Sequence, residues 1–185
     1  MRLLIMGPPG AGKGTQAVLI AQRLSIPHIS TGDLFRANLT EGTALGLEAK
    51  KYMDAGEYVP DSVTNGMVRD RLKQNDASDG FLLDGYPRTV AQVAELDGML
   101  AGNEIDKVIV LTADSDEVVK RLLHRSQDQG RSDDTEDVIR RRLEVYSEQT
   151  APLIDLYERR GVLIEVDGMG SVDQVTSNIF AALNV

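Results

Sequence analysis

Short apolar runs recur along the chain, separated by segments with helical periodicity. Five runs have the length of a buried β-strand, at residues 2–6, 27–29, 81–83, 108–111 and 162–166. After the first run, apolar residues repeat at the 3.6-residue spacing of an amphipathic helix, from Ala17 to Leu24. Continuous apolar strands that alternate with helices are typical of a parallel sheet covered on both faces. The pattern therefore predicts an α/β fold.

Two stretches interrupt this alternation. Residues 30–60 insert glycine-rich helical material before the third run. Residues 126–134, SQDQGRSDD, predict a short polar loop centred on Gly130. Both are candidates for mobile pieces at the carboxyl edge of the sheet, although the pattern of 126–134 alone fits an inert surface loop equally well.

Capping residues and proline predict several helix ends. Asp61 and Ser171 each stand directly before a helical pattern, where an N-cap is expected. Pro152 lies inside a helical pattern, and its missing N–H group and bulky ring should end or kink that helix near Ala151.

The sequence GPPGAGKGT at residues 7–15 joins the first strand to the first helix. Gly7, Gly10 and Gly12 allow the backbone to curl so that successive N–H groups point at anionic oxygens. The helix adds its positive N-terminal end, and Lys13 can reach the outer phosphates of a nucleotide. Strand, glycine turn and helix in this order predict a phosphate-binding loop rather than a glycine turn with a chance lysine.

Gly14 stands where such a loop usually carries a Ser or Thr hydroxyl that binds Mg²⁺. Without that hydroxyl, Mg²⁺ is expected to arrive with the nucleotide and to keep most of its waters, because it dehydrates reluctantly. A switch GTPase is disfavoured, since its guanine-reading Asn-Lys-x-Asp is missing: no asparagine of the chain precedes a lysine.

Composition excludes several classes of function. A net charge of −9 argues against nucleic acid as a partner, whose phosphates attract clustered Lys and Arg. With no cysteine, the chain has neither a disulfide framework nor a thiolate metal site. No apolar run approaches the ~20 residues of a membrane span, and no leader precedes the first strand. The expectation is a cytoplasmic protein of one domain, without a membrane partner.

Arginine outnumbers lysine by fourteen to six, and arginine is suited to gripping phosphate oxygens in pairs. A simpler explanation is that the arginines decorate exposed helix surfaces, so their positions along the chain must decide between the two interpretations. Arg121 and Arg125 share one face of a predicted helix, where an anion between them would turn repulsion into attraction. Arg142 leans toward the packed side of its helix and needs an anionic partner, which phosphate or a carboxylate of the protein could supply.

The segment GFLLDGYPR, residues 80–88, is a buried strand that ends in Asp84 and continues into a turn carrying Arg88. A carboxylate at the end of an apolar strand, in a fold with a phosphate loop, is placed to hold waters around Mg²⁺. Asp84 could instead cap the next helix, but the arginine in the same turn favours the magnesium role.

Together, GPPGAGKGT, TGDLFR and DGYPR resemble the nucleoside monophosphate kinases, most closely the adenylate kinase family, over essentially the whole chain. The resemblance implies a P-loop kinase fold, a five-stranded parallel sheet with helices on both faces, in a single domain over residues 1–185. It also implies two mobile segments: a monophosphate-binding segment at residues 30–59 and a short lid at 125–134, which lacks the long, sometimes zinc-bearing insertion of many relatives.

The resemblance further implies three sets of site residues. ATP would be held by Gly10, Ala11, Gly12, Lys13, Gly14, Thr15, Arg121, Arg125 and the backbone of Gly170. AMP would be bound by Thr31, Arg36, Glu57, Tyr58, Val59, Gly85, Tyr86, Pro87, Arg88, Gln92, Arg131 and Arg142. The catalytic cations would be Lys13, Arg88, Arg121, Arg125, Arg131 and Arg142. The two histidines, His28 and His124, match no site position and are interpreted as structural.

The implied activity is reversible phosphoryl transfer from Mg-ATP to AMP, giving two ADP, by a monomer that uses magnesium and no zinc. No general base is required, because an AMP phosphate oxygen is already anionic. Thr31 and Gln92 resemble the adenylate enzymes, whereas pyrimidine kinases more often carry Ala and Asn there; a UMP or CMP kinase is one alternative. A sensor that binds adenine nucleotides without turnover is another, disfavoured by the number of arginines.

Overall fold

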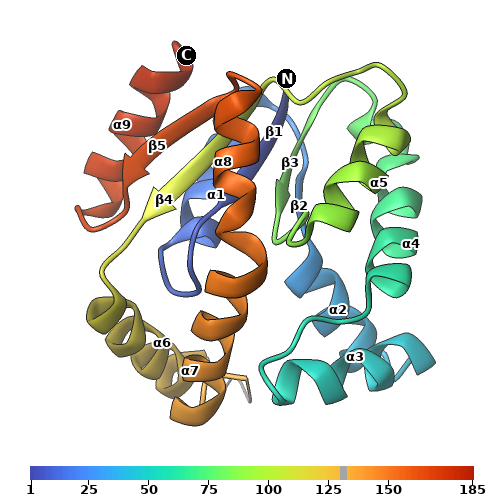
Figure 1. Ribbon diagram of the computed structural model, residues 1–185, viewed down its shortest axis with the longest axis vertical. Coiled ribbons are helices and arrows are strands. Elements are labelled where there is room, and N and C mark those ends of the chain that lie inside the picture. Colours follow the sequence, from blue (N-terminus) through green and yellow to red (C-terminus); the bar gives the residue numbers. More distant parts are fainter. Residues whose placement is uncertain (130–132) are drawn as a thin grey trace.

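The computed structural model describes residues 1–129 and 133–185, in which strands and helices alternate along the chain (Figure 1). The strands are β1 (Arg2–Met6), β2 (His28–Ser30), β3 (Phe81–Asp84), β4 (Lys107–Thr112) and β5 (Leu163–Asp167). The helices are α1 (Lys13–Leu24), α2 (Thr31–Thr40), α3 (Ala44–Asp54), α4 (Asp61–Leu72), α5 (Val90–Leu100), α6 (Ser115–Gln129), α7 (Glu136–Val145), α8 (Pro152–Arg159) and α9 (Val172–Leu183).

The strands form one parallel sheet in the order β2-β3-β1-β4-β5. Each strand begins and ends within one residue of the apolar run that predicted it, so the predicted α/β fold is confirmed. The connections out of β1 and β3 lead to opposite sides of β1. Such a reversal opens a crevice at the carboxyl ends of the strands, which is where ligands bind in sheets of this kind.

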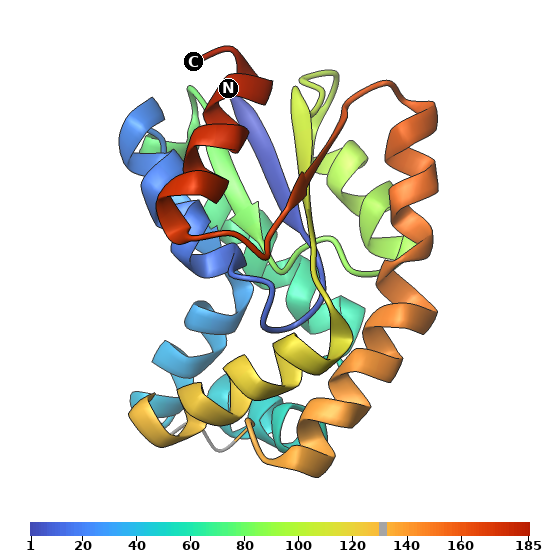
Figure 2. The same ribbon diagram turned by 90° about the vertical axis from the view of Figure 1, so that its left-hand side faces the viewer.

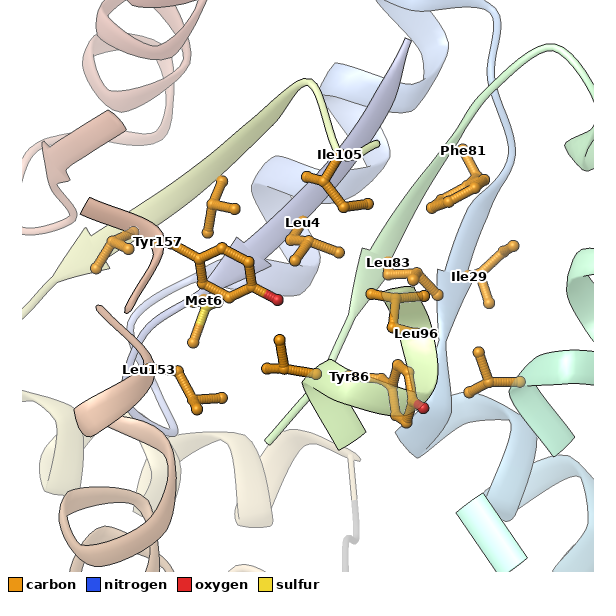
Figure 3. Packing of buried hydrophobic residues seen from close by; sticks show 14 of the residues in the cluster. Leu4, Met6, Ile29, Phe81, Leu83, Tyr86, Leu96, Ile105, Leu153 and Tyr157 are labelled. Carbon is orange, nitrogen blue, oxygen red and sulfur yellow. The ribbon is translucent and has the colours of Figure 1, made fainter. Parts of the chain in front are cut away.

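Successive residues of the central strand point to opposite faces of the sheet and build two separate cores. Leu4 and Met6 pack under α4, α5 and α8, together with Tyr86 and Tyr157 (Figure 3). Leu3 and Ile5 pack on the other face under α1 and α9. Figure 2 shows the resulting three layers, with the sheet between the two groups of helices.

The remaining helices extend beyond the carboxyl ends of the strands, α2 and α3 on one side and α6 and α7 on the other (Figure 1). The segment with α2 and α3 has a small core of its own, in which Phe35, Ala49 and Val59 are buried. These residues contribute to neither core of the sheet. The monophosphate-binding segment predicted at residues 30–59 is therefore a separate packing unit on the sheet.

Two predicted helix ends are wrong. The loop expected at residues 126–134 does not begin at Ser126, because α6 continues to Gln129; residues 126–129 lack the glycine or proline that would end a helix. Gly130, the predicted centre of that loop, lies outside the described residues. Asp61 is the first residue of α4 rather than its N-cap, which is Pro60. The side chain of Asp61 is instead engaged in tertiary hydrogen bonds described below.

The other two predictions of helix ends are confirmed. Ser171 caps α9, since its hydroxyl accepts a hydrogen bond from the Gln174 N–H group at 3.3 Å. The α-helical ladder ends at Val145 and passes through a π-helical turn at Tyr146–Thr150, after which Pro152 opens α8. Proline is well suited to a first helical position, where its missing N–H group is not needed.

Candidate active site

A cavity of about 730 Å³ lies at the carboxyl ends of the strands. It is bordered by the phosphate loop, α2, the chain before α4, the turn after β3, α6 and α7. Every predicted site residue that the structure describes lines this cavity, from the phosphate loop to Gly170. Arg131, which was predicted to close over the phosphates, lies outside the described residues.

The phosphate loop curls tightly against the neighbouring chain. Gly7 and Gly10 have φ angles of +139° and +85°, which side chains rarely adopt. A Cβ atom on Gly7 would lie 2.4 Å from the carbonyl oxygen of Leu111, so the loop could not pack here with any other residue. Gly12 precedes α1 and supplies no side-chain cap, which leaves the N–H groups of the first helical turn available to an anion.

Lys13 is partly buried and lines the cavity. Its ammonium donates hydrogen bonds of 2.8 Å to the carbonyl oxygens of both Gly7 and Pro8. Burial lowers the pKa of Lys13 to about 8; the nearby Asp84 carboxylate opposes this shift, and arginines, of which Arg88 has the largest effect, reinforce it. A phosphate bound here would restore the missing negative charge and stabilise the ammonium.

Asp84 ends β3 and faces the phosphate loop. A Cβ atom on Gly14 would stand 3.8 Å from the Asp84 carboxylate, so the position of the missing hydroxyl is directly opposite this side chain. Thr89, not Asp84, caps α5, which rules out the alternative interpretation of Asp84 as a helix cap. One carboxylate with open space before it suits a magnesium ion that keeps most of its waters.

Two arginines of the cavity are joined by one buried carboxylate. Arg125 binds Asp134 through two hydrogen bonds of 2.7 and 2.8 Å, and Arg142 binds the same carboxylate at 2.7 Å. Arg142 also contacts the backbone and carboxylate of Asp133, at 3.0 and 3.2 Å. Burial lowers the pKa of Arg142, and these two aspartates counteract the effect. The anionic partner that Arg142 was predicted to need is thus supplied by the protein.

Arg88 is held from three sides. Its Nε–H donates to the Gly85 carbonyl at 2.8 Å, and its guanidinium carbon lies 4.8 Å from the ring centroid of Tyr58. The Thr150 hydroxyl donates a hydrogen bond of 2.9 Å to the Arg88 carbonyl and so accepts the one of 2.7 Å from the Tyr58 hydroxyl. The terminal guanidinium nitrogens of Arg88 have no hydrogen-bond partner among the described residues. Arg88 lines the cavity, so these nitrogens are available to phosphate oxygens.

The side of the cavity next to α2 is built around Gly85. The buried Thr31 donates its hydroxyl hydrogen bond to the Gly85 carbonyl at 2.9 Å. A Cβ atom on Gly85 would lie 2.7 Å from that hydroxyl and 2.8 Å from the Arg88 guanidinium. The glycine of DGYPR is therefore required because two side chains converge on its backbone.

The remaining predicted cations also reach the cavity. Arg36 pairs with Asp33 at 2.5 Å on the side of α2. Arg121 donates a hydrogen bond of 3.1 Å to the Gly168 carbonyl, close to the chain that carries Gly170. Arg121 and Arg125 both line the cavity, as their spacing on one helix face predicted.

Sequence reasoning missed several residues of the site. His28, interpreted as structural, lines the cavity, and its buried Nε2 lies 3.5 Å from the Asp84 carboxylate without a hydrogen-bond partner in the described chain. Only the pairing of β2 with β3 reveals this position. His28 lies opposite Leu82, so it shares a sheet face with Asp84, two residues after Leu82. Asp133 and Asp134 could be inferred only once Arg142 was known to be buried.

The described residues contain neither a metal-binding cluster nor a membrane-spanning helix. Within residues 1–129 and 133–185, no cluster of three or more His, Cys, Asp or Glu could hold a metal ion. Nor does any helix in the described part of the chain have the length and apolar character needed to cross a membrane.

Comparisons with known proteins agree with this geometry. A model of the adenylate kinase family matches residues 5–162. The adenylate kinase of a Nocardioides species is 67% identical over 187 aligned positions, which cover 100% of this chain and 98% of the relative. That of Kocuria rhizophila is 65% identical, over 98% of both chains. That of Bifidobacterium longum is 52% identical, over 99% of this chain and 100% of the relative.

Proposed function

The chain belongs to the adenylate kinase family, and we propose that its cavity holds ATP and AMP end to end while a phosphoryl group passes between them, giving two ADP. One observation carries this proposal. Lys13, Arg88, Arg125 and Arg142 converge on a single cavity at the carboxyl edge of the sheet. Two buried carboxylates, those of Asp133 and Asp134, hold Arg125 and Arg142 in place.

The ATP phosphates would lie on the phosphate loop. The uncapped N–H groups at the start of α1 and the ammonium of Lys13 would bind the outer phosphates, and the residues from Gly10 to Thr15 line the cavity at this point. Arg121 and Arg125 approach from α6, and the backbone at Gly170 borders the space left for the base. These residues would together form the ATP side of the cavity.

AMP would occupy the opposite wall. Thr31, Gln92 and the chain from Glu57 to Val59 line this part of the cavity and would surround the base and ribose, while Arg36 and Arg88 would bind the phosphate. Arg88 is the more firmly positioned of the two, because its backbone, its Nε–H group and its stacked face are all fixed. A fixed arginine edge aligns the acceptor oxygen without further reorganisation.

The chemistry needs no proton-abstracting side chain. An AMP phosphate oxygen is anionic at neutral pH and attacks the terminal phosphorus of ATP directly, while the bond to the ADP oxygen breaks. Charge spreads over the transferred group as this happens, and positioned cations stabilise it. Lys13, Arg88, Arg125 and Arg142 supply that charge, assisted by Arg121 and, from outside the described residues, Arg131.

Magnesium would be carried by ATP and would neutralise part of the phosphate charge. Asp84 is the residue suited to hold its waters, since it faces the loop where the usual hydroxyl is replaced by Gly14. No zinc is needed for this chemistry. We further infer that the segments 30–59 and 125–134, of which residues 130–132 lie outside the described part of the chain, would enclose the nucleotides, because water would otherwise compete with AMP as the nucleophile.

The test is the appearance of ADP when the purified protein is given magnesium and ATP with AMP, UMP or CMP in turn. We expect rapid ADP formation when AMP is the acceptor and not when UMP or CMP replaces it. Equal or greater turnover with UMP or CMP would favour a pyrimidine kinase, and binding of ATP and AMP without any ADP would favour a sensor.

A further inference from the structure

We propose that Asp61 is a specificity-determining residue, which selects adenine by fixing the orientation of the Gln92 side-chain amide. The inference rests on the proposed function, in which Gln92 borders the base of AMP. Asp61 lies outside the lining of the cavity and was expected only to cap a helix. Its contacts give it a different role.

Gln92 is buried, with 2% of its surface exposed, and both ends of its amide are engaged. Its Oε1 accepts a hydrogen bond of 2.7 Å from the backbone N–H group of Arg88. Its Nε2 donates one of 2.7 Å to Oδ1 of Asp61. The backbone N–H group can only donate and an ionised carboxylate can only accept, so the two partners impose the same orientation. A flipped amide would face a donor with its NH₂ and a carboxylate with its oxygen.

Asp61 is itself held in place. Its second oxygen, Oδ2, accepts a hydrogen bond of 2.9 Å from the Thr89 hydroxyl. Thr89 in turn accepts a hydrogen bond of 3.1 Å from the Gln92 backbone N–H group. Asp61, Thr89 and Gln92 therefore form a closed hydrogen-bonded ring that joins the start of α4 to the start of α5. The carboxylate cannot rotate away without breaking two bonds.

A fixed amide discriminates between bases. After its two internal bonds, the Gln92 amide retains one N–H donor and one acceptor lone pair, on known sides. Adenine offers the complementary pair, an acceptor at N1 and an amino donor at C6. Hypoxanthine and guanine reverse both, with N1–H as donor and O6 as acceptor, and uracil reverses them in the same way. An amide free to flip could match either pattern; the amide held by Asp61 matches adenine.

The sharpest comparison is between AMP and IMP, because their bases differ only in the reversed edge. Dissociation constants for both are measured by titration calorimetry without ATP, so the result does not depend on turnover of IMP. The variants are Asp61→Ala, which removes the acceptor, and Asp61→Asn, which keeps the shape but can present either an oxygen or an NH₂ group. The matched control is Asp70→Asn, the same charge change at an exposed position of α4.

We expect Asp61→Ala to lower the preference for AMP over IMP by about tenfold and Asp61→Asn by about threefold, while Asp70→Asn leaves it unchanged. If the role of Asp61 were purely structural, its substitution would weaken the binding of AMP and IMP alike, and the ratio of their dissociation constants would stay at the parent value. An unchanged ratio in folded Asp61→Asn, with or without a folded Ala variant, overturns the inference. Failure of the parent protein to bind AMP would instead overturn the proposed function.

Discussion

The stacking of Tyr58 on Arg88 gives a sharp test of how the acceptor phosphate is aligned. Tyr58→Phe removes the hydroxyl that bonds Thr150 and keeps the ring over the guanidinium; Tyr58→Leu removes both. A half-buried cation–π contact is worth about 1 kcal/mol, and a neutral hydrogen bond about as much. Since ~1.4 kcal/mol is a factor of ten, the full loss in the Leu variant has an upper limit of roughly thirtyfold.

Arg88 keeps two other restraints, its Nε–H bond to Gly85 and its backbone bond to Gln92, so part of its alignment survives. We therefore expect kcat/KM for AMP to fall about threefold in Tyr58→Phe and about tenfold in Tyr58→Leu. The KM for ATP should stay at the parent value, because the ring faces the acceptor side.

Steady-state kinetics with each nucleotide varied in turn would measure these effects. Tyr52→Phe, the same chemical change in the small core of the monophosphate-binding segment, is the matched control. Parent-like kcat/KM for AMP in Tyr58→Leu would refute the role of the stack. Equal losses for AMP and ATP would show that the substitution damages the fold instead.

Three further predictions concern charge and packing. Arg88→Ala and Arg142→Ala should each cut kcat by roughly a hundredfold or more in protein that still folds, and near-normal turnover would refute the role of that residue. Arg142→Ala should also lower the thermal midpoint, because it removes a partner of the buried Asp133 and Asp134 carboxylates. The pKa of about 8 at Lys13 in the free protein predicts that kcat/KM for ATP falls as pH rises through 8, because the ammonium that binds phosphate loses its proton; a flat profile to pH 9.5 would contradict this. The buried Tyr157 hydroxyl has no partner among the described residues, so Tyr157→Phe should raise the free energy of unfolding by about 1 kcal/mol in a urea titration, and a loss of stability would show that the hydroxyl is satisfied.

The sequence predicted the sheet well because its strands are buried on both faces and read as continuous apolar runs. The phosphate loop was equally predictable from the sequence, since its glycines and Lys13 act through local backbone geometry. The prediction placed the end of α6 too early because polarity is a weaker signal than glycine or proline, and residues 126–129 contain neither.

The parts that escaped prediction depend on contacts between distant segments. The bond between Tyr58 and Thr150 joins residues 92 positions apart, and that between Asp61 and Gln92 spans 31. No local spacing reveals such pairs. The place of His28 beside Asp84 was not predicted for the same reason, because it follows from the pairing of β2 with β3.

The most direct test of the central claim compares a cation with the best-placed candidate for a general base. His28 stands 3.5 Å from Asp84 inside the cavity, the arrangement a proton-abstracting pair would adopt. The measurement is kcat for ADP formation from ATP and AMP in His28→Gln and Arg142→Ala, under identical saturating conditions. Catalysis by fixed cations predicts that His28→Gln stays within about threefold of the parent while Arg142→Ala falls by roughly a hundredfold. The reverse order, with the histidine variant inactive and the arginine variant active, would contradict it.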